Sequence, residues 1–91
     1  QQTLDNIFNL VESEYEDYEV DYEDENLRID SLKNNNVFII SIHSPTSQIW
    51  LSSPISGAHH FEKFSSKPLV WVSTRDSNIR IFDLLKKELG S

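Results

Sequence analysis

The chain has 91 residues, of which 15 are acidic and 8 are Lys or Arg, and it contains no cysteine. This length suits one small domain, so we treat residues 1–91 as a single unit. The lack of cysteine excludes disulfides, thiolate metal sites and cysteine nucleophiles.

The net charge of −7 is unevenly distributed along the chain. Ten of the acidic residues precede residue 28, and no Lys or Arg lies among them. Such a region repels nucleic acid and anionic membranes, and it attracts cations or basic partners. No apolar run approaches the roughly 20 residues that a membrane span needs. We therefore expect neither nucleic acid nor a membrane among the partners.

A helix is predicted near the N-terminus, with Thr3 as a candidate N-cap. Its apolar residues recur with a helical period; they are Leu4, Ile7, Phe8, Val11 and Tyr15. From residue 18 the period changes to two, which indicates a strand with one apolar face and one acidic face. The apolar face carries Tyr18, Val20 and Tyr22, and the acidic face carries Asp17, Glu19, Asp21 and Glu23.

Further strands are predicted at residues 27–32, 37–43, 48–52, 59–64 and 69–73. They are rich in β-branched and aromatic residues, and turns containing Asn, Pro or Ser separate them. Short turns imply antiparallel neighbours, because parallel pairs need long crossovers.

A second helix is predicted near the C-terminus, with N-cap candidates at residues 76–78 and an apolar stripe within residues 81–89. The fold class is therefore α+β. We expect a two-layer α/β sandwich, with two helices packed on one face of an antiparallel sheet of five to six strands. The order is one helix, the strands and one helix, and the other sheet face is left to solvent or partners.

The acidic segment at residues 12–25 is the first candidate site. Nine carboxylates in fourteen residues form an oxygen-rich surface suited to hard cations, including iron and calcium. Side chains two apart on a strand are separated by about 6.5–7 Å, so binding would be weak and exposed. The alternative interpretation is a solvated charged face that protects the edge of a sheet.

Trp50 is the second candidate. Alternation in residues 48–52 places Ile49 and Leu51 on one side of the strand and Trp50 on the other. If the aliphatic pair faces the helices, Trp50 stands on the open face, as in a binding hot spot. Its polar neighbours on that face are then Gln48, Ser41 and His43. The alternative is that Trp50 belongs to the core.

Little in the sequence supports catalysis. His59 and His60 would point to opposite faces of a strand, so we interpret them as surface histidines. No serine lies in a nucleophile elbow, and there is no glycine-rich phosphate loop. We expect no enzymatic activity. Weak ferroxidase activity on the acidic segment is not favoured, because the carboxylate and histidine cluster of a di-iron centre is missing.

Residues 44–57, SPTSQIWLSSPISG, are similar to the signature of eukaryotic frataxins, T-P-N-K-Q-I-W-L-S-S-P-x-S-G. Residues 16–20 resemble the acidic first strand of that family. Residues 71–73 and 82–89 resemble its last strand and second helix. The similarity covers nearly all of the chain, which therefore resembles a frataxin of the eukaryotic, mitochondrial type.

The resemblance assigns roles to both candidate sites. It implies weak, surface-bound iron (Fe²⁺ or Fe³⁺) on an acidic ridge, whose matching residues here are Glu12, Glu14, Glu16, Asp17, Glu19 and Asp21. It also implies partner binding through an exposed tryptophan, which corresponds to Trp50, with Gln48, Ser41 and His43 beside it. His60 stands where the family tends to have an arginine, and it joins this partner-binding set.

The function implied by the resemblance is that of an iron-binding accessory protein of iron–sulfur cluster assembly. Such a protein regulates a cysteine desulfurase–scaffold complex through its sheet face and acidic ridge. The alternative is an iron chaperone or storage protein that acts mainly through the ridge. We expect a monomer that forms oligomers with iron. The expected location is the mitochondrial matrix, with the transit peptide absent from this sequence; the alternative is the bacterial cytoplasm.

Overall fold

The computed structural model describes residues 2–90. Its elements, in chain order, are α1 (Gln2–Glu14), β1 (Tyr18–Glu23), β2 (Asn26–Ser31), β3 (Val37–His43), the short 3-10 helix η1 (Ser44–Thr46), β4 (Gln48–Ser53), β5 (Gly57–Ser66), β6 (Leu69–Ser73) and α2 (Ile81–Leu89). Neither helix of this part of the chain is long and apolar enough to cross a membrane.

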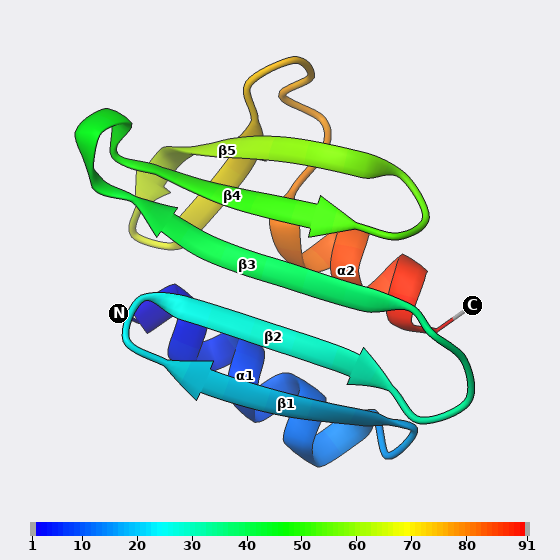
Figure 1. Cartoon of the computed structure of the whole chain (residues 1–91). Helices are drawn as coiled ribbons and strands as arrows, with labels where there is room; N and C mark the ends of the chain where they lie inside the picture. The colour runs from blue at the N-terminus through cyan, green and yellow to red at the C-terminus, as the bar shows by residue number, and fades with distance from the viewer. Residues whose placement is uncertain (1, 91) are drawn as a thin grey trace.

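The six strands form one sheet in the order β1-β2-β3-β4-β5-β6, and every neighbouring pair is antiparallel. Both helices lie on the same face of this sheet, with α1 behind β1 and β2 and α2 behind the central strands (Figure 1). The predicted α+β sandwich, with its order of one helix, six strands and one helix, is confirmed.

The core lies between the sheet and the two helices. From the sheet it receives side chains at alternate positions, including Phe38, Ile40, Ile49, Leu51 and Phe61, all at most 1% exposed. From the helices it receives Leu4, Ile7, Val11, Ile81 and Leu85. Because Ile49 and Leu51 face the helices, the intervening Trp50 faces the open side of the sheet, as the first interpretation predicted.

The predicted N-caps are wrong at both helices. Helix α1 begins at Gln2, so Thr3 lies within it; its side chain is buried and accepts a hydrogen bond from the indole of Trp71. Helix α2 begins at Ile81. Its N-cap residue is Arg80, whose side chain makes no capping hydrogen bond. Asp76 instead accepts the backbone N–H of Asn78 within the preceding turn. A polar side chain caps a helix only from the N-cap position, where the backbone is not yet helical.

The turn between β4 and β5 is tied to α2 by the buried side chain of Ser53. Its hydroxyl donates to Glu88 Oε1 at 2.6 Å and accepts the backbone N–H groups of Ile55 and Ser56 at 3.0 and 3.1 Å. Gly57 then opens β5 at a φ of 90°, which suits glycine. This strand runs to Ser66, so it is longer than the predicted 59–64.

Candidate partner-binding surface and acidic ridge

The open face of the sheet carries a row of polar and aromatic side chains across β3, β4 and β5. The register places Ser41 opposite Trp50 and Trp50 opposite His60. In the next row His43 lies opposite Gln48. The structure therefore brings together all five residues of the predicted partner-binding set. His59 lies on the other face and is hydrogen-bonded to Ser56, so the two histidines diverge as predicted.

Trp50 is enclosed between two imidazole rings. The ring of His43 stacks on the indole with 3.8 Å between centroids and 13° between planes. The ring of His60 stacks with 4.3 Å and 10°. Parity on the strands predicts a shared face for these residues, but it does not reveal the stack. We refer to His43, Trp50 and His60 as the aromatic stack.

Hydrogen bonds fix the aromatic stack from its edges. The indole Nε1–H of Trp50 donates to Oε1 of Gln48 at 2.8 Å. Nδ1 of His43 lies 2.7 Å from the hydroxyl oxygen of Thr46, in η1. With its ring faces and its N–H engaged, Trp50 has little rotamer freedom left to lose when a partner binds.

A shallow hollow of about 170 Å³ adjoins the aromatic stack on the open face. It is lined by Ile39, Ser41, Trp50, Leu51, Ser52, Ala58 and His60. Ile39 is 42% exposed, which is unusual for an aliphatic residue in a central strand. Sequence reasoning missed Ile39, although its parity with Ser41 and His43 places it on the same face.

The predicted ridge residues lie along one edge of the molecule, and all six are exposed. Glu12 and Glu14 belong to the last turn of α1, whereas Glu16 and Asp17 lie in the turn that leads to β1. Glu19 and Asp21 lie on β1 with their side chains on the open sheet face, because Tyr18, Val20 and Tyr22 take the other side. We keep the name acidic ridge for these six residues.

Two basic residues lie beside this acidic region, although residues 1–27 contain no Lys or Arg. Lys33 forms an ion pair with Asp17 at 3.0 Å. Arg28 lies opposite Asp21 in the β1–β2 register and forms an ion pair with Asp30 at 3.0 Å. The pKa of Arg28 is raised mainly by its hydrogen bond to Asp30, with smaller contributions from the charges of Asp30 and Asp21. The ridge is therefore less negative locally than its sequence suggests.

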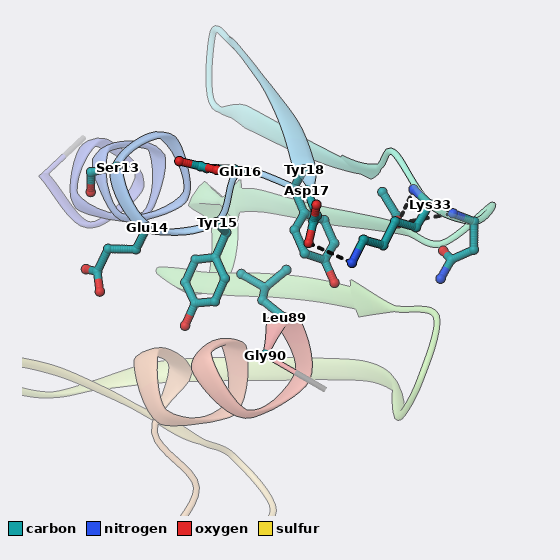
Figure 2. A pocket seen from close by; sticks show the side chains of 11 residues that line it. Ser13, Glu14, Tyr15, Glu16, Asp17, Tyr18, Lys33, Leu89 and Gly90 are labelled. Atoms are coloured by element: carbon teal, nitrogen blue, oxygen red, sulfur yellow. Dashed lines mark hydrogen bonds and ion pairs between the residues drawn. The ribbon is translucent and has the colours of Figure 1, made fainter.

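A hollow of about 450 Å³ lies where the ridge meets the end of α2. Figure 2 shows Glu14, Glu16 and Asp17 pointing away from one another, with Asp17 turned toward Lys33. Within residues 2–90, no three His, Cys, Asp or Glu side chains converge in a way that would hold a metal ion. Any cation on the ridge would thus be bound through a few exposed carboxylate oxygens.

Comparison with known proteins identifies the family. A family model described as "Frataxin-like domain" matches residues 1–91. The chain belongs to the frataxin family. Its sandwich of two helices on a six-stranded sheet is the arrangement shared with the frataxin structures described next.

Two frataxins show the extent of the sequence similarity. The mitochondrial frataxin homolog of Schizosaccharomyces pombe is 39% identical over 67 residues, which cover 74% of this chain and 41% of that protein. The mitochondrial frataxin-like protein of Leishmania donovani is 38% identical over 55 residues, which cover 55% of this chain and 27% of that protein. The chain thus spans less than half the length of these relatives, and both are named as mitochondrial.

Solved frataxin structures match nearly the whole chain. Trimeric frataxin from the yeast Saccharomyces cerevisiae, with its full-length N-terminus, superposes with a TM-score of 0.81 at 26% identity and covers 98% of this chain and 74% of that one. The trimeric yeast frataxin complexed with ferrous iron superposes with a TM-score of 0.74 at 26% identity, covering 98% and 76%. The frataxin fold therefore extends over the described residues.

Proposed function

We propose that the chain is a non-enzymatic accessory protein of iron–sulfur cluster assembly. It regulates a cysteine desulfurase–scaffold complex by docking on it with the open face of its sheet. The observation that supports this most directly is the position of Trp50. This tryptophan lies on the sheet face that no helix covers, among polar neighbours and beside an exposed Ile39.

A few residues contribute most of the binding energy of a protein–protein interface. Tryptophan is enriched among the residues that dominate protein–protein affinity, especially where it is surrounded by groups that exclude water. Trp50 is held by its stacking partners and by the hydrogen bond to Gln48, so ordering it on docking costs little. The hollow beside it offers space for a side chain of the partner.

The acidic ridge supplies the second part of the proposal. Glu19 and Asp21 lie on the same sheet face as Trp50, so one partner surface can contact both. A basic patch on the desulfurase would be steered to this edge and held there. Iron is then weakly bound cargo or a modulator of docking, in keeping with a yeast relative that is complexed with ferrous iron.

The proposed location is the mitochondrial matrix, because the relatives from S. pombe and L. donovani are named as mitochondrial. We propose a monomer as the docking species, with oligomers forming on iron loading. The trimeric yeast structures support the capacity of this fold to form oligomers.

Equilibrium binding to a reconstituted cysteine desulfurase–scaffold complex tests the proposal. Trp50→Ala should weaken binding about tenfold or more, because hot-spot truncations cost roughly 2 kcal/mol or more. Phe64→Ala is the matched control, since Phe64 is an aromatic residue that is 69% exposed but does not line the hollow beside Trp50. An affinity of Trp50→Ala equal to that of the parent would show that the sheet face around Trp50 is not the docking surface.

A second candidate function is iron chaperoning or storage through the acidic ridge. The observation that favours it is the exposure of all six ridge carboxylates. This candidate predicts that the triple variant Asp17→Asn, Glu19→Gln and Asp21→Asn loses iron delivery, whereas Trp50→Ala retains it. Iron transfer to an acceptor scaffold, measured for both variants, separates the two functions.

A further inference from the structure

Within the aromatic stack, the edge of the Trp50 indole is the main part of the ring that a partner can contact. Both faces of Trp50 are covered, by His43 at 3.8 Å and by His60 at 4.3 Å. Its N–H is bound to Gln48. Polar recognition at the centre of this sheet face must therefore come mainly from the two imidazoles.

His43 is held through Nδ1, which lies 2.7 Å from the hydroxyl oxygen of Thr46. With Nδ1 engaged, Nε2 is the ring nitrogen through which His43 can contact a partner. Protonation converts Nε2 into a charged donor, which changes the kind of group that the ring can bind.

Charged groups lie on both sides of the aromatic stack on the open face of the sheet. On β5, Glu62 lies on the same face as His60, two residues further along the strand. Directly after β6, the neutral residue Thr74 donates its backbone N–H to the His60 carbonyl. In the cross-strand row that contains Ser41, the next residues are Asn26 on β2 and Glu23 on β1. In the adjacent row, Arg28 on β2 lies opposite Asp21 on β1. Negative charge thus lies at the β1 edge and, on the other side of the stack, at Glu62 of β5, which is opposite Gln48. The imidazoles lie between these two positions.

We propose that the aromatic stack binds an acidic segment of the partner protein, with a carboxylate held by the imidazolium groups of His43 and His60. This inference rests on the proposed docking through the sheet face and names the chemistry of the partner surface. A partner that is basic over the β1 edge and acidic over the stack would be complementary to both of these regions.

The proposed contact depends on pH in a defined direction. Histidine side chains change charge between about pH 5 and pH 8. A protonated imidazole is a donor at both ring nitrogens and can give a carboxylate a charge-assisted hydrogen bond, which a neutral ring cannot give. Each imidazolium also lies over a face of Trp50, where the ring quadrupole stabilises a cation. Docking should therefore tighten as the pH falls from about 8 to about 6.

Binding to the reconstituted desulfurase–scaffold complex is measured at about pH 8, 7 and 6 for the parent, for His43→Gln/His60→Gln and for Trp50→Ala. We expect the parent to bind about tenfold more tightly at about pH 6 than at about pH 8, and the double variant to lose most of that change. The comparison at each pH removes titration of the partner itself. His60→Arg, with a fixed charge, should bind at about pH 8 more tightly than the parent.

Each other outcome is decisive. Equal pH dependence of the parent and the double variant would overturn the inference and leave docking through the sheet face intact. Weaker binding of the parent at low pH, lost in the double variant, would show that the stack meets a basic group instead. Absence of binding by the parent at every pH would reject the proposed function and this inference together.

Discussion

The indole N–H of Trp71 in β6 donates a hydrogen bond of 2.8 Å to the hydroxyl of Thr3 in α1. Both side chains are buried, with exposed fractions of 6% and 0%. The bond joins residues 68 positions apart and attaches the first helix to the last strand. In a domain without disulfides, such a contact between its two ends contributes directly to stability.

Thr3→Val should destabilise the domain, because valine keeps the shape of the side chain but leaves the buried indole N–H of Trp71 without this acceptor. The expected loss is about 1–3 kcal/mol in the free energy of unfolding. Urea denaturation measures it, with Thr3→Ser as the control that retains the hydroxyl. A valine variant as stable as the serine variant would contradict the role assigned to this bond.

Ser53→Ala should also destabilise the domain, since the Ser53 hydroxyl bonds the buried Glu88 and two backbone N–H groups of the β4–β5 turn. We expect a loss of about 2–3 kcal/mol, because a buried carboxylate loses a hydrogen-bond donor. Ser52→Ala, at the exposed neighbouring position, is the control and should change stability little. Thermal unfolding measures the stability of both variants. A Ser53→Ala variant as stable as Ser52→Ala would contradict the role assigned to the Ser53 hydroxyl.

Lys33→Gln should strengthen weak cation binding on the acidic ridge. The substitution removes the ion pair that occupies Asp17 and makes the ridge more negative. Because the pair is exposed, the gain is limited to about fivefold in the Fe²⁺ dissociation constant. Anaerobic calorimetry compares it with Lys67→Gln, a control between β5 and β6 that removes the same charge at the sheet edge opposite β1. An equal effect of both substitutions would attribute the gain to net charge alone.

Alkaline pH should destabilise the domain through Tyr18 and Tyr22. Burial is the main cause that raises the pKa of both phenols; the charge of Asp17 adds for Tyr18, and a hydrogen bond to Asp5 adds for Tyr22. A raised folded pKa gives stability that is complete below the unfolded pKa of about 10 and is lost as the pH rises through the folded pKa.

The measurement is the free energy of unfolding between about pH 8 and pH 11.5, compared with the variant Tyr18→Phe/Tyr22→Phe. The parent should lose stability above about pH 10 more steeply than the variant. Identical slopes would assign the alkaline decline to other groups, such as the lysines.

Much of the fold is predictable because periodicity reports which side of an element is buried. The change from a helical period to a period of two at Tyr18 correctly marks the start of β1. Helix α1 ends earlier, at Glu14, so Tyr15 of the predicted helical stripe lies outside it. Alternation in β4 correctly places Trp50 on one face of the strand and Ile49 and Leu51 on the other. The N-caps fail because a hydroxyl or carboxylate takes the best available partner, and the partner of Thr3 lies in a distant strand.

The composition of the candidate sites is predictable, but their geometry depends on register and on rotamers. The pairing of β3, β4 and β5 brings His43 and His60 to the two faces of Trp50, and no local pattern contains that information. Likewise Lys33 reaches Asp17 only because the chain after β2 returns to the α1–β1 turn, where the Leu32 N–H bonds the Asp17 carbonyl at 2.8 Å. The charge of the ridge is therefore visible in the sequence, and its partial neutralisation is not.

The central claim is that Trp50, on the open sheet face, couples the chain to cysteine desulfurase activity. The most direct test is sulfide production by the reconstituted desulfurase–scaffold complex, with the parent protein, with Trp50→Ala and with the control Phe64→Ala. The account predicts stimulation by the parent and by Phe64→Ala, and loss of stimulation with a folded Trp50→Ala. Full stimulation by Trp50→Ala, or none by the parent, would contradict it.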